Sequence, residues 1–192
     1  MSDWKSRLHE DLEPLLRLND PRPQISAYHD MPYAIFCYPP TDEFALRQEL
    51  GLLKTRLESA AKRVTVISLA KCLKTALDRE GVPTQKIEQA EKRTGVAKMQ
   101  ETFANILSRR QPLDELVAEE LPADPDATRD VVFIVRAGAL FPFYRTSSLL
   151  EQLKGKVSVP AVLFYPGELD GAAGLRFMGA LDAEHNYRPK IF

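Results

Sequence analysis

Cysteine and histidine, on which many active sites depend, are scarce in this chain. Its 192 residues include two cysteines, Cys37 and Cys72, and three histidines. Two cysteines are too few for a disulfide scaffold or a zinc site. No histidine lies at motif spacing from a cysteine or serine that it would activate. We therefore predict no catalytic residue and no metal site, and we interpret both cysteines as reduced core residues of a cytoplasmic protein.

The chain also lacks a charge excess and long apolar runs. Its formal net charge is −1, whereas a dedicated nucleic-acid-binding domain usually carries a strong basic excess. We therefore expect no direct DNA contact, although the basic residues Lys92, Arg93, Arg109 and Arg110 keep a DNA-contacting subunit as an alternative. No apolar run approaches the ~20 residues that a membrane-spanning helix needs, and the first residues have no apolar signal-peptide core. We therefore expect no membrane association.

Short apolar runs that alternate with helical patterns carry the fold prediction. Residues 33–38, 64–70, 130–137 and 159–167 are almost continuously apolar, as strands are when both faces of a sheet are covered. The pattern predicts an α/β fold with a doubly wound, mostly parallel sheet of about four or five strands, Rossmann-like or P-loop-like. We predict a single domain over residues 1–192.

The gap between the second and third predicted strands is too long for a bare connection. Its residues are polar and helical in pattern, with a thin apolar stripe and no strand signal. We therefore predict a helical insertion over about residues 82–128.

A glycine-rich stretch after the fourth predicted strand raises the question of a phosphate site. Gly167, Gly171 and Gly174 do not have the spacing of a dinucleotide-binding or P-loop motif. The stretch carries Glu168 and Asp170 and no lysine, so its charge would repel a phosphate. We predict instead a β-turn with Pro166 and Gly167 at its centre, no functional phosphate loop and no cofactor.

The other strand ends are rich in aromatic residues and proline, in "FCYPP", "LFPFY", "LFYPG" and "HNYRPKIF". Pro142 fits the first turn of a helix over about 142–153. Arg136 at the end of the third strand is expected to pair with a nearby acid. Because parallel strands end at one edge of the sheet, the aromatic residues should gather there, as partner contacts or as core residues that close a vacant nucleotide crevice. Both interpretations are kept.

Four segments of the chain together are characteristic: "YAIFCYPPTDEFALRQELGLL", "VISLAKCL", "AGALFPFYRTSSLLEQL" and "VPAVLFYPGELDGAAGLRFMGALDAEHNYRPKIF". In these segments the chain resembles the BrxB family, a component of BREX bacterial phage-defence systems. Its motif positions, taken as candidate partner-contact residues, are Phe141, Pro142, Arg145, Tyr165, Pro166, Gly167, Glu168, Asn186, Tyr187 and Arg188.

The resemblance implies an accessory, non-catalytic adaptor. Its expected partners are a PglZ phosphatase-like protein, an AAA-type ATPase and an adenine methyltransferase, which carry the chemistry of the system. One alternative is a nucleotide-binding regulatory subunit that uses Gly138, Gly167 and Arg136, and another is the DNA-contacting subunit. A homodimer is left open.

Overall fold

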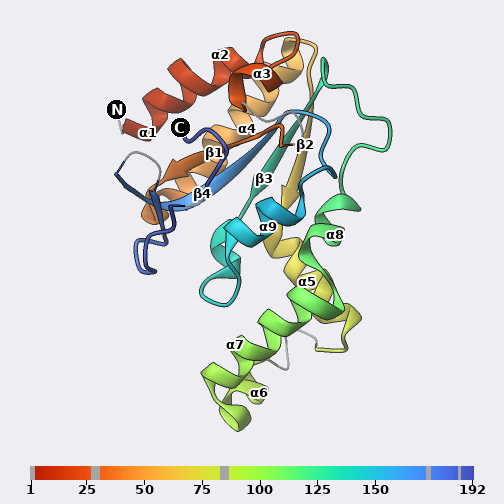
Figure 1. The fold of residues 1–192 in the computed structure, drawn as a ribbon, viewed down its shortest axis with the longest axis vertical. Helices are drawn as coiled ribbons and strands as arrows, with labels where there is room; N and C mark the ends of the chain where they lie inside the picture. Colours follow the sequence, from red (N-terminus) through yellow and green to blue (C-terminus); the bar gives the residue numbers. More distant parts are fainter. Residues whose placement is uncertain (1–2, 27–30, 83–86, 172–173, 186) are drawn as a thin grey trace.

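A parallel β-sheet with the strand order β2-β3-β4-β1 forms the centre of the molecule, which is a computed structural model (Figure 1). The structure describes residues 3–26, 31–82, 87–171, 174–185 and 187–192. The strands are β1 (Tyr33–Tyr38), β2 (Arg63–Ser68), β3 (Asp130–Val135) and β4 (Ala161–Asp170). A fifth strand, β5 (Gly174–Phe177), pairs antiparallel with the end of β4. The predicted α/β fold with a parallel sheet is therefore confirmed.

The central strands β3 and β4 and the strand β1 are mostly apolar because they separate two hydrophobic cores. Every residue of β1 and β3 is buried. Along β1, Phe36 points into one core and Ile35 into the other. Phe164 and Leu163 divide in the same way on β4. A sheet covered on both faces needs no polar face, which explains the continuous apolar runs.

The helices that precede β2 cover one face of the sheet. They are α1 (Asp3–Ser6), a π-helical stretch (Arg7–Leu12), α2 (Glu13–Leu16), α3 (Arg22–Ile25) and α4 (Glu43–Ser59), with a short 3₁₀ turn (Pro40–Asp42) before α4. Trp4, Leu8, Leu12 and Leu16 lie on one face of the first helical run and are all buried. Their spacing of four residues places them along one side of the helix, toward the sheet.

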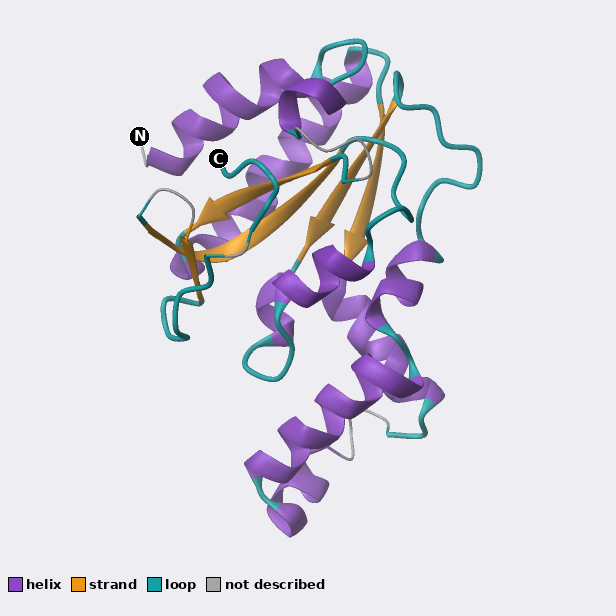
Figure 2. Cartoon of the chain, viewed as in Figure 1, coloured by secondary structure: helices purple, strands orange, loops and turns teal. Residues whose placement is uncertain are grey.

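Later helices cover the opposite face (Figure 2). They are α5 (Leu69–Arg79), a π-helical stretch (Ile106–Arg110), α8 (Leu113–Ala118) and α9 (Thr146–Gln152). Two more helices, α6 (Ile87–Thr94) and α7 (Val96–Asn105), extend away from the sheet in Figure 1 and form what we call the helical arm. No residue of α6 is buried. The described part of segment 82–128, where a helical insertion was predicted, holds helices and no strand.

Two local predictions are wrong. The predicted turn at Pro166 and Gly167 is absent: β4 continues to Asp170, because Gly167 pairs with Phe177 of β5 in the antiparallel ladder. The positive backbone φ angle lies later, at Gly171, with φ of 67°. The second wrong prediction is the start of the helix expected over about 142–153. This helix, α9, begins at Thr146 and not at Pro142. The Phe141–Pro142 peptide bond is cis and lies in the loop that follows a 3₁₀ turn (Ala137–Leu140).

The C-terminal segment adds a short extension to the sheet beside β1. The Cys37 amide donates to the Phe192 carbonyl at 2.9 Å, and the Phe192 amide donates to the Ile35 carbonyl at 2.8 Å. Ile191 therefore lies parallel to Ile35 in the ladder. This pairing satisfies backbone groups that an edge strand would otherwise leave open. Among the described residues, no helix has the length and apolar character to cross a membrane.

Candidate functional site

Aromatic residues from three segments of the sequence form a continuous chain of ring contacts that ends in the C-terminal tail. The Phe141 ring lies 5.9 Å from that of Phe177, and Phe177 lies 5.3 Å from Tyr165. Tyr165 in turn lies 6.0 Å from Tyr187, in an edge-to-face arrangement. Aromatic pairs of this geometry stabilise a core beyond the area that they bury. The chain of rings joins the loop before α9, the β4–β5 hairpin and the tail.

Glu184 is the centre of a polar network next to these rings. Its carboxylate forms an ion pair with Arg145 and accepts a hydrogen bond from the Tyr187 hydroxyl at 3.2 Å. The Tyr187 hydroxyl also lies 3.2 Å from the hydroxyl of Thr146, the first residue of α9. The backbone of Glu184 exchanges two hydrogen bonds of 3.0 Å with Leu175 of β5. Glu184 therefore joins the start of α9, strand β5 and the tail residue Tyr187.

The environment of these groups determines their ionisation. Burial raises the pKa of Glu184, but hydrogen bonds from Ser147 and Arg145 outweigh it, so the pKa lies below the usual value and the group is a carboxylate. Burial raises the pKa of Tyr187 to about 12. Burial and the neighbouring Tyr187 raise the pKa of Tyr165 further. Both tyrosines are therefore neutral at physiological pH, and neither is activated as a base or nucleophile.

A cleft of about 700 Å³ opens between α9 and the tail, and we call it the tail cleft. Residues of α9 and of the loop before it form one wall, and residues 183–185 and 187–189 form the other. Arg145, Glu184, Tyr187 and Arg188 line it together with Ser147. Among the described residues, no hydrogen bond or ion pair involves the Arg188 side chain, and Arg188 is exposed. The cleft thus offers a free cation beside an aromatic ring that is held in place.

The structure gives the motif positions different environments. Tyr165, Pro166 and Gly167 are buried in β4, where a Cβ on Gly167 would lie 2.5 Å from Tyr165 Cε1. Phe141 is half-buried, and Asn186 lies outside the described residues. The exposed members are Pro142, Arg145, Glu168 and Arg188. The structure brings Arg145, Tyr187 and Arg188 together in the tail cleft, whereas Glu168 lies on the hairpin outside the set of cleft-lining residues.

Sequence reasoning missed Glu184, the residue with the most connections in the network. Its one local signal is its position three residues before Tyr187, which is too general to identify it. Arg136, in contrast, pairs with an acid as predicted: its Nε lies 3.3 Å from Glu43 Oε1. Gly138 and Pro166 lie against this pair at the carboxyl ends of the strands.

The structure also shows the environment of the two cysteines and of the residues that could bind a metal ion. Cys37 and Cys72 are buried and unpaired, and burial raises the pKa of each thiol to about 11. Neither is therefore a reactive thiolate. In the described part of the chain, no group of three or more His, Cys, Asp or Glu side chains has an arrangement that could hold a metal ion.

Comparison with known proteins identifies the family. The family model described as "BREX protein BrxB" matches residues 65–191, which include most of β2, all of β3 to β5 and the residues that line the tail cleft apart from Met31. The chain belongs to the BrxB family. A curated relative, the BREX protein BrxB of Bacillus cereus (strain H3081.97), is 25% identical over 162 residues, which are 83% of this chain and 82% of the relative. No solved structure matches the chain significantly. Membership of the BrxB family makes the chain a component of a BREX system.

Proposed function

We propose that this BrxB protein is a non-catalytic adaptor in BREX phage defence, and that it acts through protein–protein contacts at the tail cleft. The observation that carries the proposal is the convergence of Arg145, Tyr187 and Arg188, from two distant motif segments, on one cleft. Arginine and tyrosine are enriched at protein interfaces and at their energetic hot spots. The neutral tyrosines and the unreactive cysteines support a non-catalytic role.

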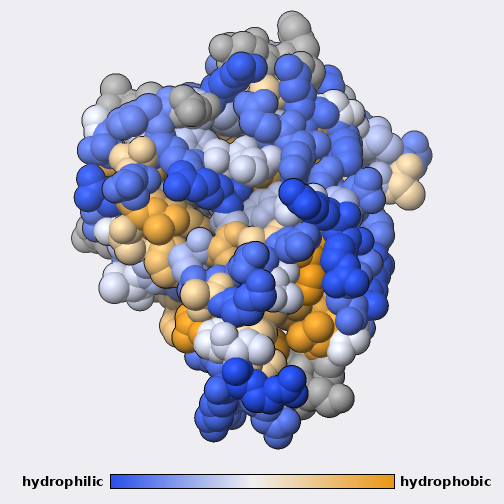
Figure 3. Space-filling model, turned by 60° about the horizontal axis from the view of Figure 1, so that its bottom comes forward, coloured by the Kyte–Doolittle hydropathy of each residue, from blue (hydrophilic) through white to orange (hydrophobic). Residues whose placement is uncertain are grey.

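The surface supports a partner that binds through mixed polar and apolar contacts. Figure 3 shows several separate apolar areas, with hydrophilic side chains between them, on the side that Figure 1 shows at the bottom. Interfaces of proteins that also exist apart from their partner have such mixed surfaces. We propose the PglZ phosphatase-like protein, the AAA-type ATPase and the methyltransferase of the same system as the partners, with the complex in the cytoplasm.

The DNA-contacting alternative is supported less well than the adaptor. Of the four basic residues considered for DNA contact, Lys92 pairs with Glu88, and Arg110 pairs with Glu80. A cation that is already paired releases fewer counterions from DNA and contributes less affinity. We therefore propose no direct DNA contact. The nucleotide-binding regulatory alternative lacks a phosphate loop, since Gly167 lies within a strand and not in a loop.

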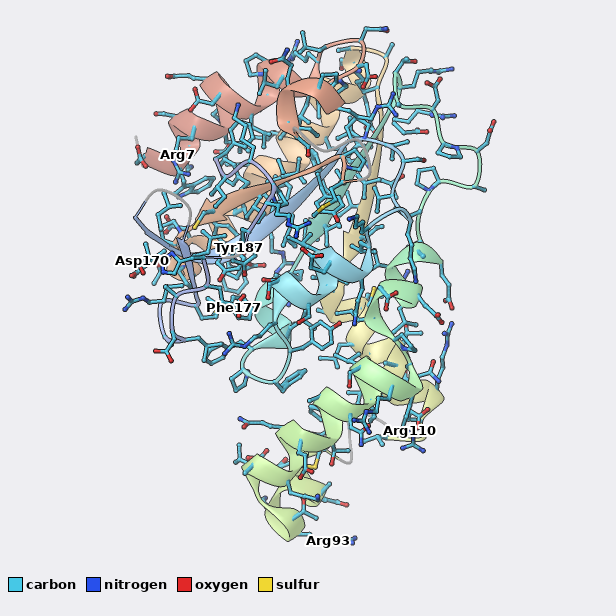
Figure 4. The ribbon with its side chains drawn as sticks, in the orientation of Figure 1. Arg7, Arg93, Arg110, Asp170, Phe177 and Tyr187 are labelled. Carbon is cyan, nitrogen blue, oxygen red and sulfur yellow. The ribbon has the colours of Figure 1, made fainter. Side chains whose placement is uncertain are left out.

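Affinity capture of the protein from a host with an intact BREX system tests the proposal. We expect Arg188→Glu to lose the partner and phage protection while the protein keeps its thermal stability. The matched control is Arg93→Glu, which makes the same charge change far from Tyr187, at the end of the helical arm (Figure 4). Loss of capture in both variants, or in neither, would contradict the assignment to the tail cleft.

A charge exchange between Arg145 and Glu184 tests whether Arg145 contacts the partner or only positions the tail. Arg145→Glu places a carboxylate beside Glu184, so it breaks the network whatever its role in binding. The double variant Arg145→Glu with Glu184→Arg restores an ion pair with the charges reversed. If Arg145 only positions the tail, the double variant recovers partner capture. If Arg145 contacts the partner, the double variant regains stability but not capture.

A further inference from the structure

The carboxyl ends of β1 and β3 enclose a second pocket, which is separate from the tail cleft. After β1 the chain enters α4 on one face of the sheet, and after β3 it enters α9 on the other face. Such a reversal of direction creates a crevice at which open α/β sheets bind ligands. A pocket of about 330 Å³ lies at this position. Pro40, Pro166 and Met178 form its apolar wall, and Arg136 and Glu43 are its charged members.

Glu43 orients the Arg136 side chain through one of its nitrogen atoms. The Arg136 Nε lies 3.3 Å from Glu43 Oε1. The other carboxylate oxygen of Glu43 accepts a hydrogen bond from the Tyr38 hydroxyl, which fixes the carboxylate. No hydrogen bond joins either Nη group of Arg136 to a described residue, and the side chain is 39% exposed. The two Nη groups therefore remain available as a fork, the geometry with which arginine binds carboxylates and phosphates.

The backbone of Arg136 supports a role beyond the ion pair with Glu43. Its φ and ψ angles are 64° and 34°, in the left-handed region that residues other than glycine seldom adopt. Such conformations cost free energy and tend to cluster at functional sites. Gly138 leaves space beside it: a Cβ there would lie 3.4 Å from Met178 Sδ and 3.6 Å from Pro166 Cγ. A side chain at this position would occupy part of the pocket.

We propose that this pocket binds a small molecule that presents a carboxylate or phosphate to the Arg136 fork and an apolar part to Pro166 and Met178. The volume is at the lower end of the range for small-molecule sites, about 300–1,000 Å³. The ligand is therefore smaller than a dinucleotide. The inference is independent of the adaptor function, because the pocket shares no lining residue with the tail cleft.

Titration of the full chain, followed by NMR at the Gly138 amide and the Arg136 Nε–H group, tests this proposal. The probes are benzoate and phenyl phosphate, which share an apolar ring and separate the carboxylate from the phosphate, and benzamide, which is their neutral analogue. We expect saturable shifts with one or both anions and none with benzamide. Shifts that are linear with concentration, or equal with benzamide, would overturn the proposal.

Three variants test whether the ligand binds to the two Nη groups of Arg136. Arg136→Gln should weaken binding at least tenfold, and Arg136→Lys should weaken it as well, since lysine keeps the charge but not the fork. The control Arg188→Gln, in the tail cleft, should leave it unchanged. Unchanged binding in Arg136→Gln would overturn the proposal, and thermal unfolding of each variant checks that the fold is kept.

The sign of the effect at Glu43 is the sharpest prediction. Glu43→Gln removes a negative charge beside the ligand but keeps an oxygen that accepts from the Arg136 Nε–H group. Binding of an anion should therefore strengthen, on the order of threefold or more. Unchanged or weaker binding in this variant would contradict the assignment of an anion beside Glu43.

Discussion

The rings of Tyr165 and Tyr187 lie 6.0 Å apart with their planes at 77°, which joins a central strand to the C-terminal tail. Tyr165 is fully buried in β4, whereas Tyr187 is half-buried and lines the tail cleft. Buried Tyr165 therefore positions the tail that carries the exposed Arg188.

Substitutions at Tyr187 should separate its ring from its hydroxyl. Tyr187→Phe loses hydrogen bonds to Glu184 and Thr146 and should lower the free energy of unfolding by about 1 kcal/mol. Tyr187→Ala also loses the contact with Tyr165 and should cost about 3 kcal/mol. Chemical denaturation measures both. Equal effects of the two variants would show that the ring contributes no stability.

Two glycine-to-alanine variants should change stability in opposite directions. In Gly167→Ala the new Cβ would lie 2.5 Å from Tyr165 Cε1 and against the Arg176 carbonyl, so we expect a loss of more than about 2 kcal/mol. In Gly51→Ala, inside α4, no described atom lies within 4 Å of the new Cβ. Because alanine favours helix, this variant should gain about 0.5–1 kcal/mol. Thermal and urea unfolding measure the stability of both variants. A small loss of stability in Gly167→Ala would contradict the close approach of the Gly167 backbone to Tyr165 and Arg176.

Glu13 should make stability depend on pH in the acid range. Burial raises its pKa, but hydrogen bonds from Arg56, Arg17 and His9 outweigh this and lower the pKa to about 2 from 4.5. Because the folded-state pKa is the lower one, the stabilisation is complete above pH 4.5 and is lost as the pH falls toward 2. Glu13→Gln should therefore cost about 2 kcal/mol at pH 7 and progressively less below pH 4.5.

The control for Glu13 is the exposed Glu10 in the same helical run. Glu10→Gln should change the free energy of unfolding by less than about 0.5 kcal/mol at any pH. Urea unfolding of both variants between pH 2.5 and 7 gives the comparison. A cost of Glu13→Gln that stays constant over this range would contradict the assigned cause.

Lys62 should hold two loops in place. It is 7% exposed, and its ammonium donates to the carbonyls of Leu18, Asn19 and Thr128, the last at 2.8 Å. Lys62→Met should cost about 2 kcal/mol and speed amide hydrogen exchange in both loops. Lys54→Met, which removes a partly exposed lysine paired with Glu58, should change stability by less than about 0.5 kcal/mol. Unchanged exchange in Lys62→Met would contradict the link between the loops.

The sequence alone determined the four strands and the parallel sheet that they form. A strand that is buried on both faces can be recognised in the sequence as a short apolar run, because residues on both faces lie in a core. Residues 33–38 were therefore located to the residue. Predictions failed where a local signal competed with pairing. Pro166 and Gly167 have the composition of a turn, but the antiparallel partner β5 draws Gly167 into a strand.

Only the tertiary structure decided which side chains meet. The ion pair of Arg145 with Glu184 joins residues 39 positions apart, and that of Arg136 with Glu43 joins the ends of β3 and β1. Such pairs depend on strand order and on the packing of α9 and the tail, and neither has a local signature in the sequence. The sequence shows which residue types are present, but only the fold groups them into the tail cleft and into the pocket that contains Arg136.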